Sequence, residues 1–599
     1  MRNDELTIEG RAVDLGAVNV SLEYVNNLFG DPSKISASHS YTIALPRSAH
    51  NERVLDYCVS VAHVSRVVGV PLRASYRRNG IEIVRNATAQ ITGVTPSEIQ
   101  VALFWDGLSA YTAWLAKAPR LRDLEIPQHR WTGTASAASA WAEEVTEASY
   151  NTGVAASIMP PPPCVNVWSM FQRIMNGTGA AWEAPDYRFV EEMKRLVVPL
   201  CTRAGGVNTA AGGQWEDMPA DTERGGGELY LTAGELIAGS MQTSGPDFLV
   251  PSTIDKLTVS VNQEWTVSEY GGGDAPDLSA ALFNIYNANG QLVASAPMTE
   301  TEDGRGVTIA QTFELSGVGV SFRMAIETGD GDVSALAGSG YITIVPTLKA
   351  ATVGQMYDIA ANLPDMAQID FVKAVCALFG LQLVSRPDGV LVFASLDDYV
   401  DAKAARQYVD LSDKLANYGD APRVVDFKVE GFAQRNYYKY KADPENLGTD
   451  ADGVIVSGSQ TLEKEKTAVE LPFSATRGDT IRHYKAEFDA SASSWRVEDQ
   501  AVNPRILRTY TRTDAKLGAR FEGVQYFADI LGRYYLPLSA VLAYPVQLQV
   551  FARLSEKDLA GLDFLKPVYL RQTGRFYILA KVNADATTDI SELTLIQMQ

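Results

Sequence analysis

The histidines are the first residues to consider for acid–base or metal chemistry, and the sequence scatters them. They are His39, His50, His63, His129 and His483. None lies within four residues of another, so the paired-histidine helix of zinc proteases is absent. His63 stands in an apolar stretch, and we interpret it as a structural histidine. The sequence also lacks the Gly-x-Ser-x-Gly elbow of serine hydrolases and the Walker loop of nucleotide-binding proteins.

The 72 Asp and Glu residues are too many to identify an acid–base pair without geometry. The acid and base of a glycosidase could be among them, because such a pair is recognised only by a distance of roughly 5 to 10 Å between its two carboxyl groups. Asp330 and Asp332, with Glu327 nearby, could bind calcium on a loop, but their spacing is not that of an EF-hand. The simpler interpretation is a solvated turn. We therefore predict no catalytic, cofactor-binding or metal-binding residue, and no cofactor.

Aromatic residues in the middle of the chain offer a further possibility, which is sugar stacking. Trp265, Tyr270 and Tyr286 could form a platform for a glycan, although aromatic residues in strands belong more often to the core. Gly317 and Gly319 give only half of a dinucleotide-binding fingerprint and lie in a β region, so we discount them.

Four cysteines lie far apart, and they are Cys58, Cys164, Cys201 and Cys376. No pair has the spacing of a metal or redox site, and a disulfide scaffold of this length would carry more cysteines. We expect reduced, mostly buried thiols and assembly in the cytoplasm. Residues 1–5 are polar, with no apolar signal core, and no apolar run approaches the roughly 18 to 20 residues that cross a bilayer. We therefore expect no stable membrane insertion, and release by lysis.

Composition predicts a multidomain globular protein. A chain of 599 residues is too long for one hydrophobic core, and its 46% hydrophobic and 21% charged residues are ordinary values. The net charge of -20 argues against a surface that coats nucleic acid, because phosphate binding requires clustered Lys and Arg. The basic segment 73–85 alternates with apolar residues, so we interpret it as the surface of a hairpin.

The first part of the chain predicts strands. Residues 41–46 alternate apolar and polar positions, and Asn79-Gly80 supplies the two positive φ angles of a type I′ hairpin turn. We assign residues 1–115 to an N-terminal β domain. Residues 116–163 form an Ala-rich segment, partly helical over 131–150, and four prolines at 160–163 make a stiff connector.

One pattern occurs twice. Val165, Trp168, Phe171 and Ile174 form one stripe of a helix that Gly177 ends, and a similar helix around Phe371 ends at Gly380. An apolar strand and a Pro-Asp pair follow each helix. We assign residues 164–249, including a Gly-rich loop at 205–230, to a first helix–strand unit and residues 347–420 to a second. Coincidence between two common units and a true duplication, with Phe171 matching Phe371, both remain open.

The segment between these units changes character. Short strands separated by turns predict an inserted, jelly-roll-like β-sandwich at residues 250–346. The predicted strands are 257–261, 282–286, 307–315, 322–326 and 341–345. Residues 421–599 predict a C-terminal β-rich domain, with strands at 545–551, 567–570 and 576–579. The strand at 593–596 is expected at a sheet edge, where a partner subunit could extend it. The fold class is mainly β with α+β units.

Several segments together resemble tail-hub (baseplate) proteins of tailed bacteriophages and prophages of Bacteroidetes-type bacteria. The segments are 359–366, 370–374, 379–380, 408–414, 433–440, 562–570 and 576–579, with 40–46 and the Asn79-Gly80 hairpin at the other end. The resemblance spans about two thirds of the chain and is a pattern of apolar positions and turns. The sandwich at 250–346 and the Ala-rich stretch lie outside it.

The resemblance implies a homotrimer in which each subunit carries two similar tube-like domains. Three chains then present six similar units, on which a hexameric tail tube can sit without mismatch. This favours duplication as the explanation of the repeated pattern. The implied partners are the tail tube, distal tail proteins, the tape measure protein, and receptor-binding or fibre proteins. The implied location is the tail tip of the virion.

Three functions from different classes remain. The first is a structural hub that closes the end of the tail tube, with no enzymatic activity. The second is a receptor- or glycan-binding tail protein that acts through the sandwich at 250–346. The third is a cell-wall or capsule hydrolase fused to a tail scaffold. The sequence favours the first.

Overall fold

The computed structural model describes most of the chain. The described residues are 4–26, 32, 38–58, 65–105, 108–200, 202–203, 212–221, 228–233, 235–251, 254–272, 276–348, 351–386, 388–416, 424–443, 451–476, 478–584 and 590–599. The expectations for His63 and Cys201 and part of the loop at 205–230 fall outside them. The fold is mainly β and multidomain, as predicted, with 44% strand and 18% helix.

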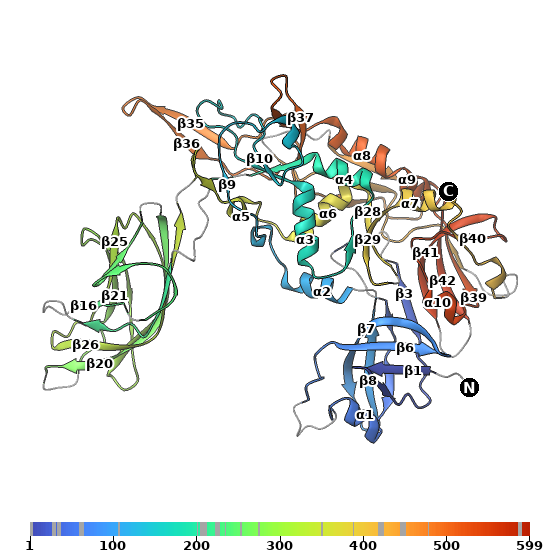
Figure 1. The fold of residues 1–599 in the computed structure, drawn as a ribbon, viewed down its shortest axis with the longest axis horizontal. Coiled ribbons are helices and arrows are strands. Elements are labelled where there is room, and N and C mark those ends of the chain that lie inside the picture. Colours follow the sequence, from blue (N-terminus) through green and yellow to red (C-terminus); the bar gives the residue numbers. More distant parts are fainter. Residues whose placement is uncertain are drawn as a thin grey trace. The chain divides into compact units, whose positions relative to one another are not determined.

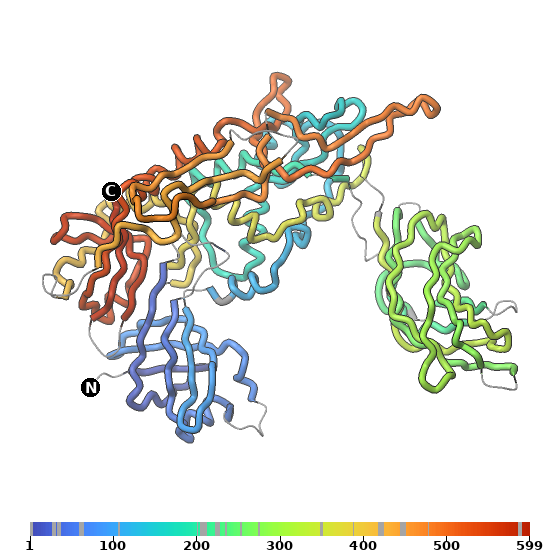
Figure 2. Tube along the Cα trace, turned by 180° about the vertical axis from the view of Figure 1, so that it is seen from behind, coloured from blue at the N-terminus to red at the C-terminus, as the bar shows by residue number. Residues whose placement is uncertain are grey.

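The chain divides into two compact units. Unit 1 contains residues 1–124, 133–201 and 364–599, and unit 2 contains residues 125–132 and 202–363. Figures 1 and 2 show the path of the chain through each unit. None of the helices among the described residues is long and apolar enough to cross a membrane.

The N-terminal part of unit 1 is a set of antiparallel strands with two helices. Its elements are β1 (Asp4–Ile8), β2 (Arg11–Val13), β3 (Leu22–Val25), β4 (His39–Ser40), β5 (Ile43–Pro46), α1 (Ala49–Val54), β6 (Leu72–Arg78), β7 (Ile81–Val94), β8 (Glu98–Phe104) and α2 (Leu108–Lys117). The predicted Asn79-Gly80 turn is confirmed, because both residues have positive φ and β6 pairs with β7 around them. The helices α1 and α2 were not predicted from the sequence.

The C-terminal part of unit 1 adds strands to the same sheet. Its elements are β30 (Val409–Asp410), β31 (Val424–Asp426), β39 (Gln547–Ala552), α10 (Glu556–Ala560), β40 (Val568–Leu570), β41 (Arg575–Ala584) and β42 (Ser591–Gln597). The sheet has 14 strands, and its main path runs β2-β1-β6-β7-β8-β4-β3-β41-β42-β39-β31. The expectation of a terminal edge strand is wrong, because β42 pairs with β39 on one side and with β41 on the other.

The middle of unit 1 is mixed α and β. Its elements are η2 (Leu121–Asp123), η3 (Ala138–Ala140), β10 (Val145–Thr146), β11 (Cys164–Asn166), α3 (Val167–Gly177), β12 (Trp182–Glu183), α4 (Tyr187–Lys194), β13 (Leu196–Pro199), α6 (Gln368–Phe379), β28 (Leu381–Ser385), β29 (Leu391–Ser395), α7 (Leu396–Ala404), η5 (Ser412–Lys414), β32 (Arg435–Lys439), β33 (Gly453–Val456), β34 (Glu465–Glu470), β35 (Tyr484–Asp489), β36 (Ser494–Asp499), β37 (Leu507–Thr511), β38 (Leu517–Arg520), η7 (Gly523–Gln525), α8 (Phe527–Tyr534) and α9 (Leu536–Ala543). The helix expected over residues 131–150 is wrong, because only Ala138–Ala140 form a short 3-10 turn there.

Both predicted helices around Phe171 and Phe371 exist, but they are not two copies of one unit. After α3 the chain forms the two-residue strand β12 and then α4, whereas after α6 it forms the hairpin β28–β29. β12 pairs in parallel with β29, so both segments contribute to one three-stranded sheet. The ring of Phe171 lies 4.9 Å from that of Phe393, whereas Phe371 packs against Phe473. Of the two alternatives left open, the different paths favour coincidence between two common units over duplication at these segments.

Unit 2 is a β structure around its own core. Its elements are β9 (His129–Arg130), β14 (Gly213–Glu216), β15 (Ala220–Asp221), β16 (Glu228–Leu231), β17 (Glu235–Gly239), β18 (Thr243–Ser244), β19 (Asp247–Leu249), β20 (Ile254–Tyr270), β21 (Leu282–Asn287), β22 (Leu292–Pro297), β23 (Thr299–Glu300), β24 (Gly306–Ser316), β25 (Ser321–Glu327), β26 (Val333–Leu348), β27 (Met356–Tyr357) and α5 (Ile359–Asn362). Five predicted strands are confirmed within β20, β21, β24, β25 and β26. The strand β14, in the expected loop at 205–230, pairs with β26.

Candidate functional site

The 14-stranded sheet of unit 1 contains the same sequence of elements twice. The first occurrence is β5, α1, β6, β7 and β8, and the second is β39, α10, β40, β41 and β42. In each, the first strand pairs antiparallel with the last, and the three later strands form an antiparallel meander. The two strand orders are therefore β6-β7-β8-β5 and β40-β41-β42-β39. We call these segments, residues 43–104 and 547–597, repeat 1 and repeat 2.

Local chemistry agrees between the two repeats. Each short helix begins after a serine whose hydroxyl accepts a hydrogen bond from the third helical residue, Ser48 from Asn51 and Ser555 from Asp558. Such side-chain caps satisfy amide groups that the first helical turn leaves without a partner. Each hairpin turns at a glycine with positive φ, Gly80 in repeat 1 and Gly574 in repeat 2.

The third helical residue is where the repeats differ. Asn51 is fully buried, its amide nitrogen donates to the carbonyl oxygens of Asp14 and Pro46 at 2.8 and 2.9 Å, and its oxygen accepts from the Asp14 amide. Asp558 is partly exposed and forms an ion pair with Lys414. Burial raises the pKa of Asp558, but hydrogen bonds from Lys414 and Ser555 outweigh it and lower the pKa.

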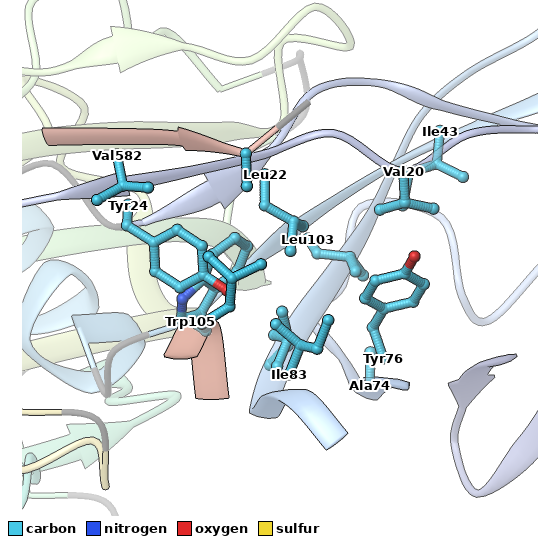
Figure 3. Packing of buried hydrophobic residues seen from close by; sticks show 14 of the residues in the cluster. Val20, Leu22, Tyr24, Ile43, Ala74, Tyr76, Ile83, Leu103, Trp105 and Val582 are labelled. Carbon is cyan, nitrogen blue, oxygen red and sulfur yellow. The ribbon is translucent and has the colours of Figure 1, made fainter. Parts of the chain in front are cut away.

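The two repeats share one hydrophobic core through strand β3. Tyr24 on β3 stands opposite Val582 on β41, and its ring lies 5.3 Å from that of Trp105, at an angle of 71°. Figure 3 shows Tyr24 and Trp105 packed together beside Val582. One cluster of buried residues contains members of both repeats, among them Ile99 and Leu595. The repeats are therefore packed as one body.

The helix of repeat 2 also contacts the hairpin of repeat 1. α10 packs on β7, and the side-chain amide of Asn79 in the turn donates to the Glu556 carboxylate at 2.7 Å. Glu556 is the first residue of α10, and the positive end of the helix dipole stabilises a carboxylate at this position. This contact joins the helix of repeat 2 to the hairpin of repeat 1.

The far end of the sheet presents apolar side chains to solvent. β31 pairs with β39, and no other strand pairs with it among the described residues. Val424 is 47% exposed, Val425 41% and the adjacent Phe427 68%. An exposed strand edge with apolar side chains is a template for pairing with another chain.

A large groove lies elsewhere in unit 1, among the described residues. It has a volume of about 880 Å³ and lies between α6, the strands β32 and β34, and the start of α9. Lys373, Lys441 and Lys466 line it together with Asp370 and Glu470. The volume is in the range of sites that hold small ligands or short peptide segments. The groove carries a small positive excess in a strongly acidic chain.

Unit 2 carries a polar face that includes aromatic residues. β16, β21 and β25 direct alternate side chains to its core, which leaves Glu228, Tyr230 and Tyr286 on the opposite face. The Tyr286 hydroxyl donates to Glu228, and the buried Asn284 donates to Glu327 at 3.1 Å. Burial and then the bond to Glu228 raise the pKa of Tyr286, so its phenol stays protonated. Tyrosine rings and carboxylates on one sheet face are the groups that bind sugar rings and hydroxyls.

The three aromatic residues weighed as a sugar platform do not share one face, and Trp265 belongs to the core, which was the favoured interpretation. Trp265 is fully buried in the core of unit 2, and its indole nitrogen donates to the Met218 carbonyl at 2.8 Å. The Tyr270 hydroxyl donates to Asp330 at 3.5 Å, near a turn. Of the three residues, only Tyr286 lies on the polar face. Its neighbour Tyr230 was missed, because it falls in the segment expected to be a loop.

The calcium hypothesis at Asp330 and Asp332 gains no support from the geometry. The Asp330 carboxylate accepts from the backbone amides of Asp277 and Asp332 at 3.1 and 3.0 Å, so it organises the turn. Glu327 instead accepts from Asn284. In the portion of the chain that the structure covers, no three His, Cys, Asp or Glu side chains are grouped to hold a metal ion.

The histidines occupy separate places. The ring of His39 stacks on Phe104, His50 contacts the Ala12 carbonyl, His129 lies in β9 and His483 is buried beside Tyr150. Cys58, Cys164 and Cys376 are free thiols, of which Cys58 is half-buried. Burial raises the pKa of the Cys376 thiol to about 12, which makes it unreactive.

No protein-family model and no curated protein matches this chain. Among solved structures, it is similar to the 43 kDa tail protein of prophage MuSo2 from Shewanella oneidensis. The identity is 9%, the TM-score is 0.19, and the match covers 64% of this chain and 98% of that protein. That structure is a prophage tail protein, but at a TM-score of 0.19 its role is not transferred to this chain.

Proposed function

We propose that this chain is a non-enzymatic structural subunit of a phage tail tip, a trimeric hub that closes the end of the tail tube. The observation that carries the proposal is the presence of two repeats in one continuous sheet. Three chains with two repeats each would offer six similar units. A ring of six similar units matches a hexameric tube without distortion, as the sequence resemblance to tail hubs implies.

The remaining surfaces fit the same proposal. A hub has to carry the distal tail, tape measure and fibre proteins that surround it. The groove beside α6 is large enough for a segment of such a partner, and its lysines favour an acidic one. We place the protein at the tail tip of the virion, assembled in the host cytoplasm.

The test is the mass of the purified protein, alone and mixed with tail-tube protein. The proposal expects a particle of three times 65.0 kDa, about 195 kDa, that binds the tube. A stable monomer that does not bind tail-tube protein would contradict the proposal. Digestion of host cell wall or capsule by the purified protein, measured by zymography, would contradict the non-enzymatic part.

A second candidate function is glycan or receptor binding through unit 2. The observation that favours it is the polar face with Tyr230, Tyr286 and Glu228. The full-length protein would then bind host cells or capsule, and Tyr230→Ala with Tyr286→Ala would remove that binding. Equal binding by that variant would exclude this face as the site.

A further inference from the structure

The groove beside α6 is bounded by the free edge of a strand. β34 belongs to a three-stranded sheet of order β33-β32-β34, so β32 pairs with only one of its two edges. Among the described residues, no strand pairs with its other edge. Glu465, Lys466 and Thr467 are exposed along this strand. The amide and carbonyl groups of such an edge are a template for a second extended chain.

The groove follows this edge of β34 and does not lie over one face of the sheet. Successive side chains of a strand point to opposite faces, so a cavity over one face would contact only every second residue. The groove is instead lined by the unbroken run 468–472, together with Lys466. Its opposite wall is one side of α6, at Asp370, Lys373 and Ala377. A strand edge and a helix therefore form the two walls of a groove of about 880 Å³.

We propose that this groove binds an extended acidic segment of a partner protein, which adds as a fourth strand beside β34 and covers α6. The proposal deepens the function proposed above, because the segment belongs to one of the tail proteins that a hub carries. β34 has six residues, so it pairs with a segment about 20 Å long, at about 3.3 Å per residue. The main-chain hydrogen bonds of an added strand supply affinity, and its side chains supply specificity.

The lysines of the groove determine the charge of the segment. Lys373, Lys441 and Lys466 line the groove with Asp370 and Glu470, so three positive charges accompany two negative ones. Lys373 lies 3.8 Å from Asp370, whereas the Lys466 ammonium donates to a backbone carbonyl at 2.9 Å. The ion pairs among the described residues include neither Lys441 nor Lys466. Because the chain has a net charge of -20, most of its surface repels an acidic segment, and this groove attracts one.

The floor of the groove is apolar and shallow in side-chain volume. Ala374 and Ala377 on α6 and Leu538 on α9 line it. Alternate side chains of an added strand point to the same face, and those that point to the helices meet these residues. The segment therefore combines carboxylates with apolar residues at alternate positions.

The first test is selection from a library of random decapeptides on the purified full-length protein. The wild type should enrich peptides that contain Asp or Glu beside apolar residues. Lys441→Ala with Lys466→Ala should weaken their binding at least 10-fold in fluorescence polarisation. The control, Lys485→Ala with Lys557→Ala, removes the same charge from exposed positions outside the groove and should change binding less than twofold. Enrichment of no peptide, or equal binding by the groove variant, would overturn the proposal.

The second test asks whether a selected peptide adds as a strand. With the peptide bound, amides of residues 465–470 should exchange with solvent at least 10-fold more slowly, while those of the β35–β36 hairpin should not change. An edge strand pairs through one of its two alternating sets of amide nitrogens. Methylation of one set should therefore weaken binding at least 10-fold more than methylation of the other. Binding without added protection of residues 465–470, or equal effects of the two methylated sets, would overturn strand addition.

These results are distinguishable from the mass measurement that tests the hub. A trimer that binds the tail tube, but whose groove enriches no peptide, would overturn the groove proposal alone. A monomer that binds acidic peptides beside β34 would overturn the hub and leave the peptide site standing.

Discussion

Replacing Asn51 by alanine tests how repeat 1 is held together. Its side chain makes three hydrogen bonds from a fully buried position, two to the carbonyl oxygens of Asp14 and Pro46 and one from the Asp14 amide. The substitution removes these bonds, while the Pro46 carbonyl keeps its bond from the Ser48 amide and the Asp14 backbone groups lie near solvent. At about 1 kcal/mol for each bond, we expect a loss of about 3 kcal/mol in the free energy of opening of repeat 1.

Hydrogen exchange with mass spectrometry measures this loss locally, which is necessary because a multidomain chain does not unfold in two states. Peptides from β5 to β8 should exchange about 100-fold faster in Asn51→Ala, since each 1.4 kcal/mol is a factor of ten. Peptides from unit 2 provide an internal reference and should not change. His50→Ala, an exposed neighbour with one bond to Ala12, should change exchange less than fivefold. Equal effects of the two substitutions would refute the assigned role of Asn51.

Three further predictions concern stability in other parts of the chain. Gly380→Ala should lower stability by at least about 1–2 kcal/mol, because Gly380 has φ +63° and a Cβ would lie 2.7 Å from a backbone oxygen. Asp443→Ala should cost about 3–5 kcal/mol, because it leaves the buried Arg505 guanidinium without its carboxylate. Hydrogen bonds from Arg323 lower the pKa of Asp247 from 3.8, despite partial burial, so the pair should stabilise unit 2 at neutral pH and lose that effect as pH falls below about 4.

A control variant for each prediction separates the proposed interaction from a nonspecific loss of stability. Gly478 has φ +66° and open space around it, so Gly478→Ala measures the backbone conformation without the collision. Asp413 pairs with Arg571 at the surface, and its removal should cost at most about 1 kcal/mol in thermal or urea unfolding. Arg323→Gln should flatten the acid dependence of exchange in unit 2. A variant as acid-sensitive as the wild type would assign that sensitivity to other groups.

The sequence predicts elements whose signals are local, and it fails where pairing is distant. The Asn79-Gly80 turn and the Gly380 helix end are correct because each depends on a backbone conformation that only a few residue types adopt. The expected edge strand at 593–596 is wrong because its two neighbours, β39 and β41, cannot be identified from an alternating pattern. Strand partners depend on tertiary packing between distant segments, so no short stretch of the sequence identifies them.

The location of the repeated segments was also not predictable from short stretches of sequence. The helix patterns around Phe171 and Phe371 look alike in sequence, yet the chain leaves the two helices along different paths. The repeats at 43–104 and 547–597 share strand order, helix caps and turn glycines, but their strands differ in length, with seven residues in β6 and three in β40. A repeat that preserves topology and changes lengths leaves little periodic signal in the sequence.

Salt offers a last test of how copies of so acidic a chain could assemble. Each copy has a net charge of -20, so three copies repel one another at long range. Val424, Val425 and Phe427 are exposed at or beside the β31 edge of the sheet, and an association through this edge, by hydrogen bonds and apolar burial, would change little with ionic strength. Because salt screens repulsion over a Debye length of about 10 Å at 0.1 M, the trimer should dissociate less at 0.5 M salt than at 0.05 M. Analytical ultracentrifugation across that range measures the dissociation constant. An association that weakens as salt rises would indicate ion pairs between the copies and would refute the apolar edge as their main contact.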